Sequence, residues 1–86
     1  MQYSDNGLAY AGKMEWDKAI KDLNQTLKFN PNYPDAYYNR GLAHAGKMEW
    51  DKAIKDLNQT LRFNPNYPDA KQQLQELLKS SLTGTV

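Results

Sequence analysis

Few side chains in this sequence could carry catalytic or metal-binding chemistry, and they stand far apart. His44 is the only histidine and the chain has no cysteine, so the usual imidazole and thiolate clusters that hold metal ions are missing. No nucleophile lies at a usable spacing from His44, no glycine-rich loop could cradle a phosphate, and no two carboxylates must share a cleft. We therefore predict a chain that is not an enzyme and that binds no metal ion and no cofactor.

The aromatic residues suggest a different function, nucleic-acid binding. Trp16 and Trp50 could serve as stacking platforms for bases, and some helical repeats of similar length read RNA one base per unit. The charge argues against this alternative, because eleven basic and ten acidic residues are interspersed and give a formal net charge of +1. We expect the two tryptophans to pack against the core and no nucleic acid to bind.

The charge balance also argues against binding to a membrane surface. No apolar run approaches the roughly 20 residues that a membrane-spanning helix needs, and the first five residues lack the basic and apolar regions of a secretory signal. The sequence therefore predicts a soluble, cytoplasmic protein with no membrane partner.

An internal repeat determines where helices are expected, and these helices would position the residues of any site. Residues 7–36 and 41–70 are identical at 28 of 30 aligned positions, at a step of 34 residues. The exceptions are two pairs, Tyr10 with His44 and Lys28 with Arg62. A unit this short cannot bury its apolar face alone, so the two copies must stack on each other.

Each copy contains a strongly amphipathic helix. Apolar residues recur at steps of three and four in the first copy, at Trp16, Ala19, Ile20, Leu23 and Leu27. The same stripe recurs between Trp50 and Phe63. Two prolines follow each stripe and end the helix, and the second of them, Pro34 or Pro68, suits the first position of a new helix. Gly46 is placed to terminate the helix that begins at Pro34.

These boundaries predict an all-α chain of five helices. Two helix–turn–helix units span residues 1–33 and 34–67, a capping helix spans 68–80, and a frayed tail spans 81–86.

A charged side chain is expected inside this stack. Arg40 lies near the apolar side of its helix, where an unpaired charge is costly, so Asp56 or Asp22 is its expected partner. Thr26 and Thr60 are each expected to form a hydrogen bond back to their own helix.

The period, the turns and the small residues together resemble the tetratricopeptide repeat family over about residues 1–67. The matching residues are Gly7, Ala19, Leu23 and Pro31 in the first unit and Gly41, Ala53, Leu57 and Pro65 in the second. In the family, the glycine and the alanine let the two helices of a unit approach closely. The resemblance implies a right-handed superhelical stack of antiparallel helices, an α-solenoid.

The resemblance also implies a scaffold that binds proteins. Family members typically hold a partner's peptide or helix on a concave face lined by the first helix of each unit. Carried over to this chain, the groove residues are Ser4, Leu8 and Gly12 in the first unit and Tyr38, Asn39, Leu42 and Gly46 in the second. Ser4 and Leu8 replace the lysine and asparagine that grip a C-terminal carboxylate in part of the family. We therefore expect a partner with apolar anchors, such as an amphipathic helix or another copy of the chain.

The turn between the two helices of each unit departs from the family pattern. Met14 and Met48 stand where the family usually has a glycine immediately before an acidic and an aromatic residue. A methionine forced into the left-handed conformation would cost roughly 1 to 2 kcal/mol, whereas straightening the turn would fuse two helices into one. A fused helix exposes apolar faces and invites exchange between chains.

The fidelity of the repeat leaves a further alternative open. Exposed residues recur along with the packing residues, among them Lys18, Lys21, Asn24 and Gln25. Either the duplication is very recent or the unit was engineered. In both cases no dedicated ligand need exist, and we would expect self-association through the first helix or the inter-helix turn.

Overall fold

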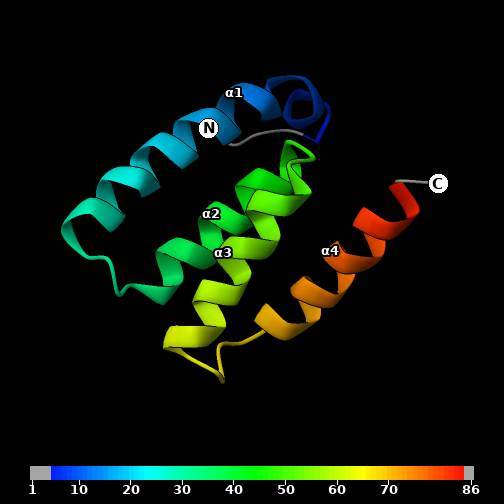
Figure 1. Ribbon diagram of the computed structural model, residues 1–86. Coiled ribbons are helices and arrows are strands. Elements are labelled where there is room, and N and C mark those ends of the chain that lie inside the picture. Colours follow the sequence, from blue (N-terminus) through cyan, green and yellow to red (C-terminus); the bar gives the residue numbers. More distant parts are fainter. Residues whose placement is uncertain (1–4, 85–86) are drawn as a thin grey trace.

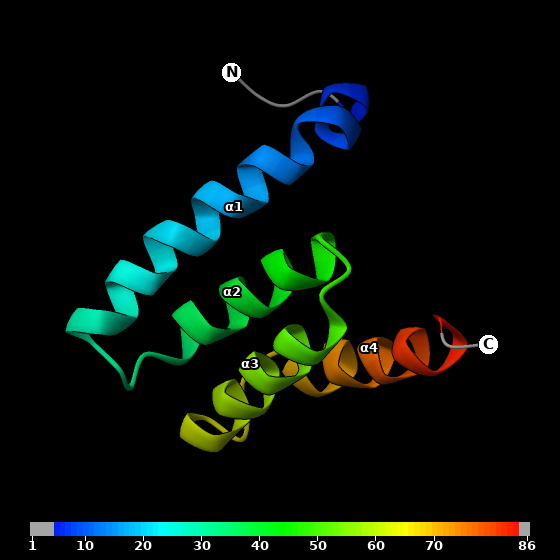
Figure 2. The ribbon, with the colours of Figure 1, turned by 45° about the horizontal axis from the view of Figure 1, so that its top comes forward.

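The computed structural model describes the backbone of residues 5–84 and the side chains of residues 15–79. This part of the chain holds four helices and no strand, the helices being α1 (Asp5–Phe29), α2 (Pro34–Gly46), α3 (Trp50–Phe63) and α4 (Ala70–Gly84). Each helix packs against the next one along the chain (Figure 1). Figure 2 shows α1 alongside α2 on one side of the α2–α3 hairpin and α4 alongside α3 on the other. The predicted all-α class is confirmed.

The predicted count of five helices is not confirmed, because the first two predicted helices are joined. α1 continues without a break through Gly12, Met14 and Trp16, where the sequence predicted a turn. A glycine inside a helix costs only about 1 kcal/mol relative to alanine, and the residues around Gly12 are good helix formers. A continuous helix is therefore an accessible conformation for this segment.

The same residue types form a turn in the second copy. Met48, between α2 and α3, has a φ of 62°, in the left-handed region. The amide of Met48 donates to the carbonyl of Ala45 at 2.9 Å, and the amide of Glu49 donates to the carbonyl of His44 at 2.9 Å. These bonds satisfy carbonyls at the end of α2 and offset part of the roughly 1 to 2 kcal/mol that a left-handed methionine costs.

Side chains hold this second turn, and His44 among them is replaced by a tyrosine in the first copy. His44 Nδ1 lies 2.7 Å from Glu49 Oε1, and Lys47 Nζ lies 2.5 Å from Asp17 Oδ1 on α1. The hydrogen bond from His44 lowers the pKa of the Glu49 carboxyl. Tyr10 occupies the position of His44 in the first copy, so the first turn lacks this imidazole. The closed and the straightened turn, both considered from the sequence, thus each occur once.

Gly46 ends α2 for a reason different from the predicted one. It does not have a positive φ, and the left-handed residue is Met48, two positions later. A side chain added at Gly46 would place its Cβ 2.4 Å from Cε2 of Trp16 on α1. Glycine is therefore needed so that the Trp16 ring can lie against the end of α2.

The predicted start and end of the capping helix both need correction. α4 begins at Ala70 and not at Pro68, because Asp69 has a φ of 65° and breaks the helical conformation. The Tyr67 ring lies 4.8 Å from the ring of Tyr38, between centroids, and the chain turns after this contact before α4 starts. α4 then continues to Gly84, past the predicted end at residue 80. In the first linker, Pro34 is the first residue of α2, as predicted.

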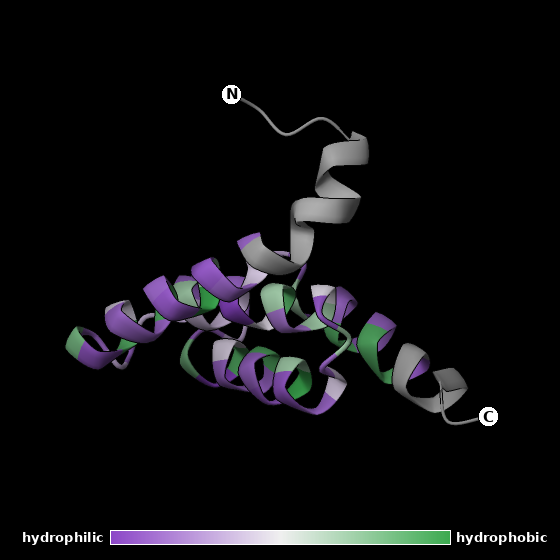
Figure 3. Cartoon of the chain, turned by 90° about the horizontal axis from the view of Figure 1, so that it is seen from above, coloured by the Kyte–Doolittle hydropathy of each residue, from purple (hydrophilic) through white to green (hydrophobic). Residues whose placement is uncertain are grey.

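The core lies where α3 contacts its neighbours. Ala53 and Leu57 on α3 are fully buried, and Leu77 on α4 packs with them. Thr60 is also fully buried, and its hydroxyl donates to the carbonyl of Asp56 at 3.0 Å, as predicted. Figure 3 shows hydrophobic residues interspersed among hydrophilic ones along the helices. The core therefore depends on a few side chains and on close contact between helices.

Substitution of Gly41 tests this close contact. A side chain added there would place its Cβ 3.3 Å from Asp56 Cβ and from Leu57 Cγ. We expect Gly41→Val to lower the free energy of unfolding by about 1 to 3 kcal/mol through overpacking, measured by urea denaturation. Asn39→Val is the control, because Asn39 is exposed on the same helix. An equal loss in both variants would contradict the proposed packing role.

Candidate interaction surface

The predicted groove residues of the second unit lie on α2. Asn39 is exposed, and Tyr38 and Leu42 are half-buried. Leu42 lies one turn from both Tyr38 and Asn39, at steps of four and three residues, so it is a neighbour of each of them on the helix surface. Gly46, the fourth, lies against the Trp16 ring. The structure therefore brings three of these four residues together as an open surface.

The predicted groove residues of the first unit are not placed beside them. Ser4 lies outside the described residues, and Leu8 and Gly12 belong to α1 in a part whose side chains are not described. Their backbone continues into the helix that contains Trp16, instead of forming a separate first helix.

An aromatic pair and two carboxylates border the α2 surface. The rings of Tyr38 and Tyr67 lie 4.8 Å apart between centroids. Burial raises the pKa of Tyr67 to about 12, and a hydrogen bond with Asp35 adds to this rise. The pKa of Tyr38 is also raised, first by burial and then by the charge of Asp69. Tyr67 was not among the predicted site residues, and its only signal was its position just before the capping helix.

Polar residues of α4 lie next to the pair of tyrosine rings. Gln72 and Glu76 on α4 stand 34 positions after Tyr38 and Leu42, and both of these side chains are exposed. A surface hollow of about 320 Å³ lies at the start of α4, lined by Pro65, Asn66, Tyr67, Asp69, Lys71 and Gln72. The surface is therefore apolar on the α2 side and polar on the α4 side.

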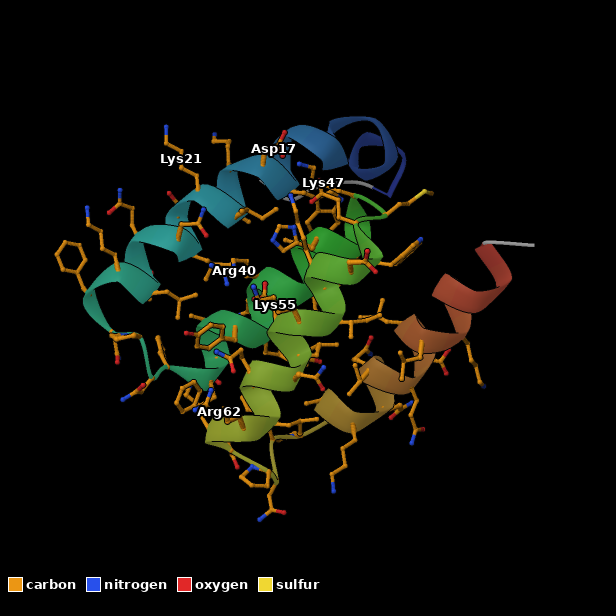
Figure 4. All side chains as sticks on the ribbon, viewed as in Figure 1. Asp17, Lys21, Arg40, Lys47, Lys55 and Arg62 are labelled. Carbon is orange, nitrogen blue, oxygen red and sulfur yellow. The ribbon has the colours of Figure 1, made fainter. Side chains whose placement is uncertain are left out.

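Arg40 occupies a different side of α2 and is held by a buried carboxylate. Its Nε and Nη2 atoms donate to the Asp56 carboxylate at 2.8 and 2.7 Å, and its Nη1 atom donates to Asn24 Oδ1 at 2.8 Å. The Asp56 residue is only 3% exposed. The hydrogen bonds to Asp56 raise the pKa of the Arg40 guanidinium. The predicted pairing with Asp56 is thus confirmed, and Figure 4 shows Arg40 between α1 and α3.

A second hollow, of about 350 Å³, surrounds this ion pair. It is lined by Ile20, Asn24, Arg40, His44, Lys52, Lys55 and Asp56. Arg40 is bound to Asp56, and His44 is bound to Glu49. The buried polar groups of this hollow are therefore partners of one another, and their arrangement stabilises the stack.

Two further findings concern the described part of the chain. No group of three potential metal ligands occurs among its residues. Its helices include none that is long and apolar enough to cross a membrane.

The residues predicted to pack the repeat fall into three groups. Gly41, Ala53 and Leu57 are buried in the second unit. Ala19 and Leu23, their counterparts on α1, are half-buried. Pro31 and Pro65 are exposed in the linkers, where they follow the ends of α1 and α3, and Gly7 lies within α1, outside the residues whose side-chain surroundings are described.

The Arg40–Asp56 pair gives a direct test of stability. Replacing Arg40 with methionine leaves the Asp56 carboxylate buried without its partner, so we expect a loss of about 2 to 4 kcal/mol in the free energy of unfolding. Lys55→Met is the matched control, because Lys55 lines the same hollow but is exposed. Urea denaturation of both variants measures the difference, and an Arg40→Met protein as stable as the control would refute the role of the pair.

Comparison with known proteins agrees with this arrangement of helices. A family described as TPR repeat matches residues 7–47, and a family described as Tetratricopeptide repeat matches residues 34–67. No curated protein and no solved structure matches the chain. Because the two matched segments together span residues 7–67, more than half of the chain, the chain belongs to the tetratricopeptide repeat family.

Proposed function

We propose that the chain is a non-catalytic interaction module that binds a peptide or an amphipathic helix on the surface formed by α2 and α4. Tetratricopeptide repeats generally mediate protein–protein interactions. The observation that carries the proposal is the half-buried pair of Tyr38 and Leu42, which lie one turn apart on α2 beside exposed Asn39. Such side chains are anchored by their helix and still offer apolar area to a partner.

The charged residues around this surface indicate the chemistry of the partner. Asp35, Asp69 and Glu76 are exposed, and so is the basic residue Lys71, which lines the same hollow as Asp69. Asp35 and Asp69 also interact with the two tyrosines. A partner with an apolar stripe and basic flanks would place apolar side chains on Leu42 and a cation near the tyrosine rings and the carboxylates.

An acidic partner or a free C-terminal carboxylate fits this surface poorly. The basic residue of α2 is Arg40, whose guanidinium is already bound to Asp56 and Asn24. His44, also on α2, is bound to Glu49. Lys71 on α4 is exposed at this surface, but a carboxylate would also approach Asp35, Asp69 and Glu76, so that its repulsion by three acidic groups outweighs its attraction to this cation.

The repeat organisation gives this surface its wider context. We take residues 1–33 and 34–67 as the two units. The capping helix that follows them is α4, which begins at Ala70. Further units stacked in the same way would form a right-handed superhelix with the first helices on its concave side. Ser4, Leu8 and Gly12 would join the groove wherever residues 1–12 fold as a separate first helix.

Binding of synthetic peptides tests the proposal. Two amphipathic helices with the same leucine stripe, one flanked by lysines and one by glutamates, are titrated into the protein by isothermal titration calorimetry. We expect the lysine peptide to bind at least about tenfold more tightly, because rim charges of opposite sign favour association. Leu42→Ser should weaken its binding by about tenfold or more.

Lys55→Ser provides the control for this experiment. Lys55 is exposed on α3, beside the hollow that contains Arg40 and away from the tyrosine pair. Its replacement should leave the affinity for the lysine peptide unchanged. Equal affinities for the two peptides, or unaltered binding by Leu42→Ser, would overturn the proposed surface.

A further inference from the structure

Identical residues on α1 and α3 are buried to different extents. Ala53, Leu57 and Thr60 on α3 are 0% exposed. Their counterparts at the 34-residue step, Ala19, Leu23 and Thr26, are all half-buried on α1. The acidic residue of this face shows the same difference in burial. Asp56 on α3 is only 3% exposed, whereas Asp22 on α1 is exposed. One face of α1 therefore lacks the cover that the same face of α3 has.

Two helices cover these residues of α3: α2, which belongs to the same unit, and α4, which follows α3 and brings Leu77 against Ala53 and Leu57. On α1 the following helix is present, as α2, whereas no described helix takes the place that α2 has on α3. α2 can lie this close because Gly41 has no side chain, and an added Cβ would be only 3.3 Å from Asp56 Cβ and Leu57 Cγ. The corresponding glycine of the first copy is Gly7, and residues 7–12 repeat residues 41–46 except at position 10. The chain thus carries a helix that matches the open face of α1.

This matching helix cannot cover the face within one chain. Residues 5–12 and residues 16–29 are parts of the same continuous helix, so the first part cannot fold back onto the second. A second molecule has the same helix and the same open face. Two α1 helices that cross in antiparallel orientation near Met14 would each cover the other's face.

We infer that two copies of the chain pair by exchanging the first halves of their α1 helices. Residues 5–12 of each copy lie on the Ala19, Leu23 and Thr26 face of the other, in the position that α2 takes on α3. The contact is symmetric, because each chain gives and receives the same surface. It uses α1 and leaves Tyr38 and Leu42 of α2 free, so this inference is independent of the proposed binding surface.

The match between residues 7–12 and residues 41–46 of α2 favours a second copy as the occupant. A contact as close as the one between α2 and α3 needs a glycine at the crossing point, because a Cβ there meets its neighbours at 3.3 Å. Residues 5–12 place Gly7 at this point and small Ala9 and Ala11 at the positions of Ala43 and Ala45. A helix without a small residue at the crossing could not approach α1 as closely as α2 approaches α3.

The hinge of the exchange is the straightened turn at Met14. A closed first unit would need Met14 in the left-handed conformation that Met48 adopts at a φ of 62°. Tyr10 replaces His44, which binds Glu49 in the closed second turn. The closed form thus carries the same backbone strain in both copies, but in the first it lacks the hydrogen bond between the imidazole and the glutamate.

Glycine substitutions at the two hinges test the inference. Met14→Gly removes the strain of the closed turn and weakens the continuous helix. Because a dimer needs two open chains, we expect its dissociation constant to rise by roughly 100-fold, at about tenfold per chain. Sedimentation or light scattering over a wide concentration range measures the mass.

Met48→Gly is the matched control for this experiment. It makes the same change in a turn that is already closed, so the dimer should persist with an unchanged dissociation constant. A wild-type protein that is monomeric at all concentrations, or equal masses for the two variants, would overturn the inference.

A cysteine pair identifies which chain covers the face. Disulfides join Cβ atoms about 3.5 to 4.5 Å apart, and a Cβ at Gly41 would lie 3.3 Å from that of Asp56. The equivalent double variant, Gly7→Cys with Asp22→Cys, is made in a chain that has no other cysteine. After mild oxidation, we expect a covalent dimer on a non-reducing gel, whereas each single variant should not give it in comparable yield.

The other results of the cysteine experiment would contradict the inference. A disulfide within one chain, seen as a monomer that has lost two free thiols, would mean that the first unit closes on itself. Free thiols in the oxidised protein would mean that no helix containing residue 7 covers the face. This readout depends on proximity alone and so remains valid if Met14→Gly lowers the stability of the protein.

Discussion

The close contact of α2 with α3 is the interaction on which the rest of the structure depends. Because Gly41 has no side chain, the two backbones lie close together beside Leu57, and Ala53 and Leu57 are buried. The ion pair between Arg40 and buried Asp56 holds α2 against α3. α1 then packs on α2, and α4 packs on α3. The orientation of α2 thereby determines which of its sides remains open, and with it the position of Tyr38 and Leu42.

The sequence was sufficient where structure follows from local pattern. The apolar stripe predicted α3 and the second half of α1, the prolines predicted the linkers, and the cost of an unpaired charge predicted the partner of Arg40. Thr26 and Thr60 form the expected bonds to the carbonyls of Asp22 and Asp56. Each of these features depends on residues within one turn, or on a charge with few available partners.

The sequence was insufficient where two conformations of a segment have similar free energy, or where contacts with another repeat unit determine the conformation. The turn at Met48 is closed with help from His44 and from Asp17 of the preceding unit, and the equivalent turn at Met14 is straight. Gly46 was expected to terminate a helix, but its role depends on Trp16, which is thirty residues away. For the candidate site, Tyr38, Asn39 and Leu42 were placed correctly on α2, whereas the contact with Tyr67 was not foreseen because it depends on how the linker turns before α4.

The hydrogen bond between His44 and Glu49 has a consequence for the evolution of this chain. Tyrosine and histidine codons differ at a single base, and position 10 or 44 is one of the two places where the copies disagree. A point mutation at position 44 would leave every buried residue of the described core unchanged and would remove the hydrogen bond that supports the turn. Two molecules with nearly the same sequence could therefore differ in whether the first unit closes on itself or exchanges helices with a second chain, without a poorly packed intermediate between them. The state of association would then vary more during evolution than the fold itself.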